Sequence, residues 1–332
     1  MTNQLTYSQR MAPPPRGRSE LYDVLGEERL RGRDVLSIAD FTTEELQLIL
    51  NTAAKLKRSK FDETQTQFSK GQTLVLLFEK PSLRTRVTFE AGMTQLGGNA
   101  IYLEGRLGQR EAIPDVARNL ERWVDGIMGR VFSHKTLAEL ADNASVPVIN
   151  GLCDLEHPCQ ALADFQTLIE HWDSVRGRRL AYVGDGNNVA HSLMLLGAKL
   201  GVHVVLGCPE GYCPLPAFVE RATADAAVSG GSITLVHDPK EAVANADAVY
   251  TDVWTSMGQE DEAEARRAIF APFQVNRDLM QHAKPTALVM HCLPAHRGEE
   301  ITSEVVDSAN SVVFDQAENR LHAQKAVLSL VL

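Results

Sequence analysis

The sequence predicts an α/β fold: two doubly wound parallel-sheet domains joined by helices, with a C-terminal helix packing back on the first domain. Short apolar runs of strand length alternate with segments of helical periodicity, which is typical of parallel sheets covered by helices. This alternation occurs in two consecutive series. With 332 residues, of which 44% are hydrophobic, the chain is long enough for two domains with separate cores.

The first series predicts a domain over residues 30–156. The residues from Thr42 to Glu45 precede an apolar helical pattern and predict a capped first helix. Helices are expected between four strands, which are Thr73–Phe78, Ala100–Leu103, Gly126–Val131 and Val146–Asn150.

The second series predicts a domain over residues 157–316. His157 and Pro158 open a helix with apolar side chains on one face, and we expect this helix to join the domains. Residues 317–332 are also helical in pattern, and we expect them to pack back on the first domain. The expected strands of the second domain are Arg179–Val183, Val202–Gly207, Ser232–Val236, Ala248–Val253 and Ala287–Met290.

Residues 1–29 are expected to form a disordered tail. The first 19 contain no Asp or Glu but three arginines and a proline run, which leaves an organelle transit peptide as the alternative. The net charge of −10 disfavours nucleic-acid and anionic-membrane partners. No apolar run approaches the roughly 20 residues that span a membrane. Five cysteines without the spacing of a disulfide framework favour a reducing cytoplasm.

The most informative segment, residues 78–90, reads FEKPSLRTRVTFE. Ser82 stands where a helix N-cap is expected, so the first turn offers free backbone N–H groups and the positive end of the helix dipole. Arg84, Thr85 and Arg86 lie in that turn, and together these groups predict a phosphoryl-binding site. The alternative is an ordinary capped helix with two solvated arginines, but cations are unfavourable at a helix N-terminus unless an anion offsets them.

Two further features carry groups suited to a carbonyl ligand. Pro158 at the first helical position leaves His157 at the mouth of its helix and Gln160 in the first turn. A neutral imidazole can donate to a carbonyl oxygen, and a carboxamide can hold an amino group. Arg130 ends a predicted strand, where open α/β sheets bind ligands. Taken alone, a capping His and a surface Arg are the simpler interpretations.

The second series carries three polar loops. Residues 184–189 follow a strand and open a helix, but Val189 replaces the third small residue of a dinucleotide-binding turn, which disfavours NAD. Asp252 and Ser256 follow another strand, where they could bind an ammonium group or cap a helix. His291 and Cys292 follow a third. With Cys153, His157, Cys159 and His296 they raise the question of zinc, but the spacings match no usual structural zinc pattern and no metal is expected.

These motifs, distributed in order from about residue 30 to residue 332, resemble those of the aspartate/ornithine carbamoyltransferase family. Residues 82–86 are similar to its phosphate signature Ser-Thr-Arg-Thr-Arg, with Leu83 where threonine is commonest and where a backbone N–H can still donate. Residues 157–160 are similar to its His-Pro-x-Gln, and residues 291–294 to its His-Cys-Leu-Pro. Residues 252–258 resemble the Asp-x-x-x-Ser-Met-Gly loop of its ornithine branch.

The resemblance implies an enzyme that transfers the carbamoyl group of carbamoyl phosphate to the side-chain amine of L-ornithine, giving L-citrulline and phosphate, without a cofactor or a metal. It implies catalytic roles for Arg130, His157, Asp252 and Cys292. Carbamoyl phosphate is expected to contact Ser82, Leu83, Arg84, Thr85, Arg106, Arg130, His157, Gln160, Cys292, Leu293 and Arg320. Ornithine is expected to contact Asn188, Asp252, Ser256 and Met257.

The resemblance also implies a homo-oligomer, a trimer or an assembly of trimers, in which Arg106 or Gln109 reaches the neighbouring subunit's site. A carbamoyltransferase for another amine, such as putrescine or an N-acylated ornithine, is the near alternative. An NAD-dependent dehydrogenase and a non-catalytic amino-acid sensor are the alternatives from other functional classes.

Overall fold

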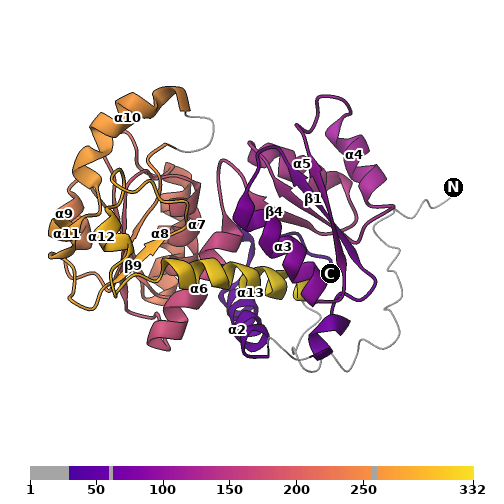
Figure 1. Cartoon of the computed structure of the whole chain (residues 1–332), viewed down its shortest axis with the longest axis horizontal. Coiled ribbons are helices and arrows are strands. Elements are labelled where there is room, and N and C mark those ends of the chain that lie inside the picture. The colour runs from indigo at the N-terminus through magenta and orange to yellow at the C-terminus, as the bar shows by residue number, and fades with distance from the viewer. Residues whose placement is uncertain (1–29, 60–62, 256–259) are drawn as a thin grey trace.

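The computed structural model describes residues 30–59, 63–255 and 260–332. These residues form two α/β lobes that lie side by side, with helices between them (Figure 1). The expected tail over residues 1–29 and two expected ornithine contacts, Ser256 and Met257, lie outside the described residues. Within the described ranges, no helix is long and apolar enough to cross a membrane.

The first lobe is built on a four-stranded parallel sheet with the order β2-β1-β3-β4. Leu74 and Leu76 of the central strand pack into a core with helices of the domain junction, while Val75 and Leu77 pack into a second core on the opposite face. Both faces are apolar because both are covered, as is usual for a parallel sheet. Its strands are β1 Thr73–Phe78, β2 Asn99–Glu104, β3 Gly126–Arg130 and β4 Val148–Leu152. Its helices are α3 Leu83–Gln95, α4 Ile113–Leu120 and α5 His134–Asn143, with short 3-10 turns η2 Ile38–Asp40 and η3 Glu63–Gln67.

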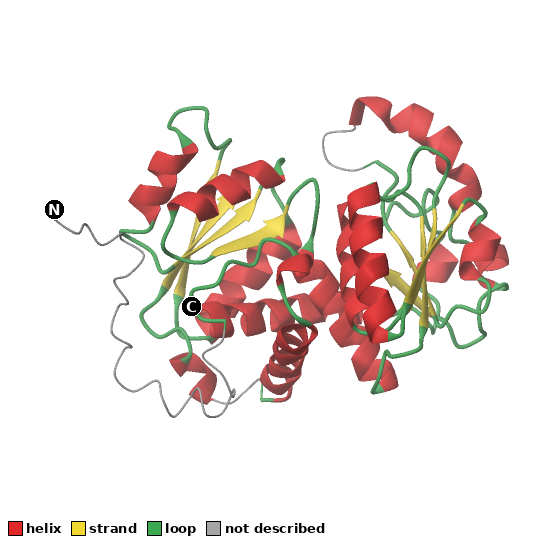
Figure 2. Cartoon of the chain, turned by 180° about the vertical axis from the view of Figure 1, so that it is seen from behind, coloured by secondary structure: helices red, strands yellow, loops and turns green. Residues whose placement is uncertain are grey.

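The second lobe is built on a five-stranded parallel sheet with the order β7-β6-β5-β8-β9. Figure 2 shows helices on both sides of each sheet. The strands are β5 Arg179–Val183, β6 His203–Gly207, β7 Ser232–Val236, β8 Ala248–Thr251 and β9 Leu288–His291. The helices are α7 Asn188–Lys199, α8 Pro216–Ser229, α9 Pro239–Val243, α10 Ala263–Phe270, α11 Arg277–Met280 and α12 Ser303–Val306, with 3-10 turns η4 Glu260–Glu262 and η5 Ala271–Phe273.

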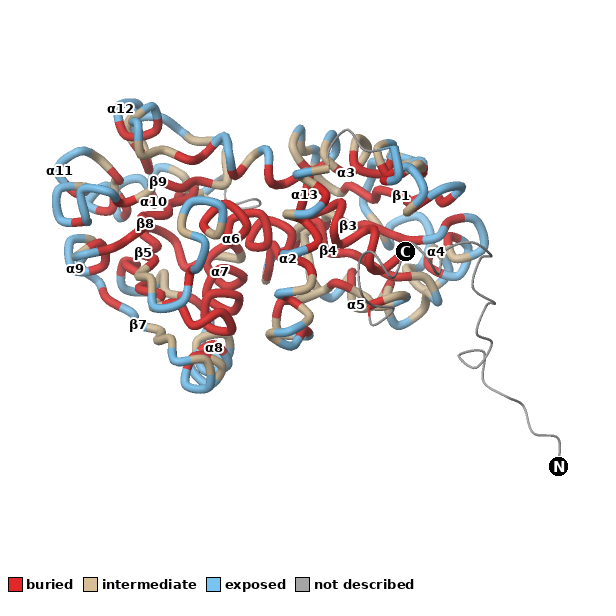
Figure 3. Tube along the Cα trace, turned by 90° about the horizontal axis from the view of Figure 1, so that it is seen from below, coloured by how far each residue is buried: buried red, intermediate tan, exposed pale blue. Residues whose placement is uncertain are grey.

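Three helices connect the lobes: α2 Thr43–Arg58, α6 Pro158–Trp172 and α13 Val313–Val331. Helix α13 packs against α6, α2 and α3, so the chain end returns to the first domain as expected. Its terminal carbonyl, on Leu332, accepts a hydrogen bond from Gln72 Nε2 at 3.0 Å. In Figure 3 the buried residues follow α6, α7 and α13 through the middle of the molecule. One apolar core therefore runs continuously from the first lobe into the second.

The observed elements agree with the two predicted series, with small shifts at their ends. The expected capping box at Thr42 is present, since Thr42 Oγ1 accepts from the Glu45 N–H at 3.2 Å and Glu45 Oε2 accepts from the Thr42 N–H at 2.8 Å. Strand β4 lies two residues later than expected, and α13 begins at Val313 instead of residue 317. The first turn of α13 was hard to predict because its large apolar residue, Phe314, is exposed and does not lie on the buried face of the helix.

Candidate active site

Most of the predicted polar site residues that the structure describes gather where the strand order of each sheet reverses. This point of reversal, called the switch point, lies between β1 and β3 in the first sheet and between β5 and β8 in the second. Open α/β sheets bind ligands at the carboxyl ends of such strands. In the first lobe, Ser82 lies after β1 and Arg130 is the last residue of β3. In the second lobe, Asn187 lies after β5 and Asp252 lies after β8. The two switch points therefore bring the four loops to one place between the lobes.

The first turn of α3 presents hydroxyl groups at the switch point of the first sheet. Ser82 is the N-cap, as predicted, and its Oγ accepts from the Thr85 N–H at 3.4 Å. Thr85 is 1% exposed. Its hydroxyl lies within reach of Ser82 Oγ at 3.2 Å, Arg320 Nη2 at 3.2 Å and Arg130 Nη1 at 3.5 Å. Three segments distant in sequence thus meet at one hydroxyl.

Three guanidinium groups form an arginine cluster here: those of Arg130 and Arg320 meet at that hydroxyl, and that of Arg84 lies close enough for its charge to act on both. Burial, followed by the charges of Arg320 and Arg84, lowers the pKa of Arg130 from 12.5 to about 10. Burial also lowers the pKa of Arg84 and of Arg320. All three remain cationic near neutrality, so the cluster holds concentrated positive charge with like charges facing one another. An anion placed here would offset both the repulsion and the buried charge.

Arg86 does not join this cluster, which corrects the expectation that both arginines of the segment bind the anion. Its guanidinium lies 3.8 Å from the centroid of the Tyr102 ring, and its Nε donates to Glu90 Oε1 at 2.9 Å. Residues two apart on a helix point to different sides, so Arg84 and Arg86 cannot both face the switch point.

His157 stands at the mouth of α6 and is 4% exposed. Its backbone N–H donates to Ser192 Oγ at 2.9 Å, which holds it against α7. Its ring Nδ1 is buried without a hydrogen-bond partner among the described residues. Burial and the charges of Arg320, Arg130 and Arg84 lower the pKa of His157 well below its ordinary value. The imidazole is therefore neutral and can donate one N–H to a ligand oxygen.

Gln160 lies one turn further into α6 and connects to the arginine cluster. Its Oε1 accepts from Arg320 Nη1 at 2.5 Å, and its Nε2 donates to Asp164 Oδ1 at 2.8 Å. Asp164 was not identified from the sequence. Its position four residues after Gln160 on a helix was the available signal.

On the second lobe, Asp252 and Cys292 face each other across β8 and β9. Cys292 Sγ donates to Asp252 Oδ1 at 2.9 Å. Burial and the neighbouring Asp252 charge raise the pKa of Cys292 well above its ordinary value, so it is a thiol and not a thiolate. Asn187 Nδ2 donates to Asp252 Oδ2 at 2.9 Å and fixes the carboxylate from the other side. Sequence reasoning missed Asn187, although an Asn preceding a helix is a recognisable N-cap.

The loop after β9 reaches back to the first lobe. The Leu293 carbonyl accepts a hydrogen bond from the Arg84 guanidinium, and the Leu293 N–H donates to His291 Nδ1 at 2.8 Å. His291 Nε2 donates in turn to Glu300 Oε1 at 3.0 Å. Asp252, His291 and Cys292 offer ligand atoms within 4.8 Å of one another, a spacing that could suit a metal ion. Both His291 nitrogens are already engaged in these protein contacts, so the trio does not make an available metal site.

The remaining predicted residues lie at the edges of this site. Asn188 begins α7, and its Nδ2 donates to the Cys153 carbonyl at 2.7 Å. The Leu83 side chain is 77% exposed. Arg106 is exposed, with its guanidinium 4.7 Å from the Phe132 ring centroid. Within the described part of the chain, its guanidinium contacts the Phe132 ring and makes no hydrogen bond to the arginine cluster.

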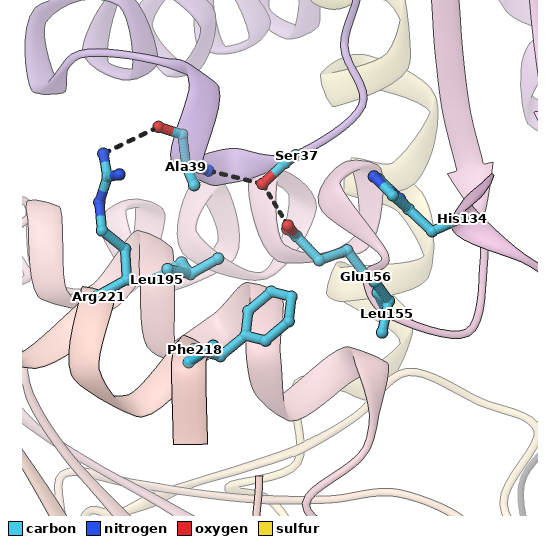
Figure 4. Close-up of a pocket in the computed structure, with 9 residues that line it drawn as sticks. Ser37, Ala39, His134, Leu155, Glu156, Leu195, Phe218 and Arg221 are labelled. Carbon is cyan, nitrogen blue, oxygen red and sulfur yellow. Dashed lines mark hydrogen bonds between the residues drawn. The ribbon is translucent and has the colours of Figure 1, made fainter. Parts of the chain in front are cut away.

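A separate pocket of about 220 Å³ is lined by residues of both lobes (Figure 4). It is lined by Ser37, Ala39, His134, Leu155, Glu156, Leu195, Ala217, Phe218 and Arg221. No predicted site residue among those that the structure describes lines it. The chemistry of the arginine cluster, and not pocket size, therefore identifies the candidate active site.

Comparison with known proteins gives matches over nearly the whole described chain. Residues 33–170 match the family model "aspartate/ornithine carbamoyltransferase, carbamoyl-P binding domain", and residues 176–331 match "aspartate/ornithine carbamoyltransferase, Asp/Orn binding domain". An ornithine carbamoyltransferase of Thermococcus kodakarensis is 59% identical over 91% of this chain and 97% of that protein. The solved ornithine carbamoyltransferase of Pyrococcus furiosus is 57% identical, with a TM-score of 0.89 over 91% of this chain and 97% of that chain. A solved N-acetyl-L-ornithine transcarbamylase is similar at 33% identity, with a TM-score of 0.82 over 90% of this chain and 100% of that chain.

Proposed function

Because this chain belongs to the aspartate/ornithine carbamoyltransferase family, we infer that it is an enzyme that transfers the carbamoyl group of carbamoyl phosphate to the side-chain amine of L-ornithine, giving L-citrulline and phosphate. The observation that carries this function is the cluster of Arg84, Arg130 and Arg320, two of which reach the Thr85 hydroxyl, beside the neutral His157. The cluster suits a phosphorylated ligand with a carbonyl group.

We assign the phosphate to the first turn of α3. Ser82, Arg84 and Thr85 offer hydroxyls, a guanidinium and backbone N–H groups there, and Leu83 contributes only its backbone because its side chain points to solvent. Charge-assisted hydrogen bonds to phosphate are among the stronger polar contacts in proteins. They also stabilise the phosphate dianion as it leaves, so no cofactor or metal is required.

The carbonyl oxygen is assigned to Thr85, Arg130 and His157. Attack of the amine on the carbonyl carbon forms a C–N bond and moves an electron pair onto this oxygen. Donors already oriented toward that charge lower the barrier more than any other single contribution. The carbon–oxygen bond to phosphate then breaks, and the nitrogen loses a proton. Gln160, Leu293, Cys292 and Arg320 complete the contacts of carbamoyl phosphate in this proposal.

The amine is assigned to the second lobe. Asp252 and Cys292 lie together at the ends of β8 and β9, where both can orient the amine and the Asp252 carboxylate can accept its proton. We place the amino-acid end of ornithine near Asn188, and we propose Ser256 and Met257 as further ornithine contacts. In this division residues 30–156 together with 317–332 form the carbamoyl phosphate-binding domain, and residues 157–316 form the ornithine-binding domain.

We further propose a cytoplasmic homotrimer, or an assembly of trimers, that serves arginine metabolism. An uncovered apolar surface on the first lobe supports self-association. It consists of Leu83 and Val87 on α3 with Ile101 and Leu103 on the edge strand β2, which are 77%, 51%, 47% and 47% exposed. Parallel sheets are normally covered on both faces, so an exposed apolar edge strand indicates a partner surface. Arg106 and Gln109 follow β2 directly and are placed to reach a neighbouring subunit's site.

One assay tests the function. Purified protein is incubated with carbamoyl phosphate and, separately, L-ornithine, putrescine or N-acetyl-L-ornithine, and ureido products are identified by mass. We expect citrulline from ornithine at a rate far above that for the other two amines. A higher rate with putrescine or N-acetylornithine would overturn the substrate assignment, and the absence of any ureido product would overturn the reaction.

A further inference from the structure

We propose that Asp164 is a positioning residue: it orients the Gln160 amide so that its oxygen faces the ligand, and thereby makes the site prefer a carbamoyl group to an acyl group without N–H. The inference rests on the proposed function, because it assumes that Gln160 contacts carbamoyl phosphate. Asp164 itself is 0% exposed and touches none of the reacting atoms in this assignment.

Asp164 collects three donors from three different elements. Its Oδ1 accepts from Gln160 Nε2 at 2.8 Å and from Gln316 Nε2 at 2.9 Å, and its Oδ2 accepts from the Tyr250 hydroxyl at 3.0 Å. Gln160 belongs to α6, Gln316 to α13 and Tyr250 to β8. A buried carboxylate surrounded by donors on each oxygen has no freedom to turn, so it is a fixed reference point beneath the site.

The donor and acceptor pattern leaves one orientation for the Gln160 amide. An ionised carboxylate only accepts hydrogen bonds, so Gln160 must turn its NH2 toward Asp164. A guanidinium only donates, so Arg320 requires the amide oxygen, and Arg320 Nη1 lies 2.5 Å from it. The same Arg320 donates to Thr85 Oγ1 at 3.2 Å, which places the Gln160 oxygen beside the hydroxyl at the centre of the arginine cluster.

The oriented oxygen has a second lone pair, which suits an N–H of the ligand. Carbamoyl phosphate carries an NH2 group where acetyl phosphate carries a methyl group, and the two molecules share the same phosphate and carbonyl. An amide turned the other way would present its own NH2 to the ligand's NH2, with no acceptor between them. Acetyl phosphate would leave this lone pair of the buried Gln160 oxygen without a donor, and such an unpaired polar group makes a site reject an analogue.

The charge of Asp164 reinforces the orientation. Burial raises the pKa of this carboxyl from 3.8 to about 6, while its hydrogen bonds to Gln316, Gln160 and Tyr250 and the nearby Arg320 charge favour ionisation. The group is therefore ionised above that pH. In that form it can only accept hydrogen bonds, which keeps the Gln160 NH2 turned toward it.

The test compares the affinity for carbamoyl phosphate with that for acetyl phosphate, each measured by calorimetry without ornithine. In Asp164→Leu the carboxylate is replaced by an apolar group of similar size. We expect the preference for carbamoyl over acetyl phosphate to fall by roughly tenfold, the value of one buried hydrogen bond, while inorganic phosphate binds as in wild type. Asp164→Asn should keep most of the preference, because its single oxygen can still accept from Gln160.

Tyr250→Phe is the matched control, since it removes one donor from Asp164 without touching Gln160, and its preference should equal that of wild type. Asp164→Ala replaces the leucine variant if that chain does not fold. The proposal would be overturned if Asp164→Leu or Asp164→Ala lowered the affinity for both ligands equally, or if the preference for carbamoyl phosphate stayed unchanged in these variants. Equal affinity of the wild-type protein for the two ligands would also overturn it, whereas a wild-type protein that forms no citrulline would instead refute the proposed function.

Discussion

Glu156 provides the clearest test of the domain junction, because replacing it by glutamine should remove a pH-dependent loss of stability. Glu156 is 1% exposed and lies beside the pocket in Figure 4. One carboxylate oxygen accepts from the Ser37 hydroxyl of the first lobe. The other accepts from the Ile38 N–H at 3.1 Å and from the hydroxyl of Ser192, in α7 of the second lobe, at 3.0 Å. One side chain therefore bridges both domains.

Burial raises the pKa of Glu156 from 4.5 to about 7, although its hydrogen bonds favour the ionised form. Below pH 4.5 the carboxyl is protonated in both the folded and the unfolded chain, and its contribution to stability is fully present. As the pH rises toward 7, the unfolded chain ionises first and this contribution is lost. At 1.36 kcal/mol for each pH unit between the two pKa values, the full loss is roughly 3 kcal/mol.

Glu156→Gln cannot ionise, yet its oxygen can accept from Ile38 and Ser192 while its NH2 faces Ser37. Urea unfolding of both proteins is measured from pH 5 to pH 8 at one protein concentration, since subunit association also affects stability. The free energy of unfolding of the variant, relative to wild type, should increase by roughly 2–3 kcal/mol over this range. Glu220→Gln, on the exposed side of α8, is the control and should show no such trend. A difference between Glu156→Gln and wild type that stays constant with pH would refute the reasoning.

Three further predictions concern the reaction. Arg84→Ala should lower the rate of citrulline formation by roughly 10- to 100-fold, because a charge-assisted hydrogen bond contributes about 1.5–3 kcal/mol. Arg86→Ala should change the rate little, because the Arg86 guanidinium lies on the Tyr102 ring. Equal effects of the two substitutions would contradict the anion-site geometry. Asp252→Asn should lower turnover while calorimetry shows nearly unchanged carbamoyl phosphate affinity, and wild-type turnover in this variant would remove Asp252 from the amine site. At subsaturating ornithine the rate should rise with pH through neutrality, because an alkylammonium titrates at about 10 and only the free amine attacks; a flat profile would contradict rate control by the free amine.

The order of the strands along the chain was predictable from apolar runs. Strands covered on both faces consist almost entirely of apolar residues, as in β1, so each run stands out without any knowledge of its neighbours. The residues at which the strands begin and end were less predictable. Strand β4 ends at Leu152 instead of Asn150, because its pairing with β3 shifts register between Gly129 and Arg130. Such a shift in register depends on the partner strand, so the sequence of β4 alone does not predict it.

The sequence by itself determined the parts of the site that are local. Ser82 as an N-cap, His157 at a proline-led helix start and Arg130 at a strand end all follow from short patterns whose physical cause lies within a few residues. The family resemblance added the expected contacts of Asp252 and Cys292. It did not indicate Asp164, whose local signal was its position four residues after Gln160 on the same helix; its contacts with Tyr250 and Gln316 depend on other elements.

Only the tertiary structure decided which side chains meet. Arg320, on the last helix, reaches Thr85 because α13 packs on α3 and α6, and Arg84 reaches the Leu293 carbonyl because the second lobe lies against the first. The same packing leaves Arg86 on Tyr102, outside the cluster. The physical reason is that capping and periodicity act between near neighbours, whereas the burial and convergence of charged groups depend on contacts between segments far apart in the chain.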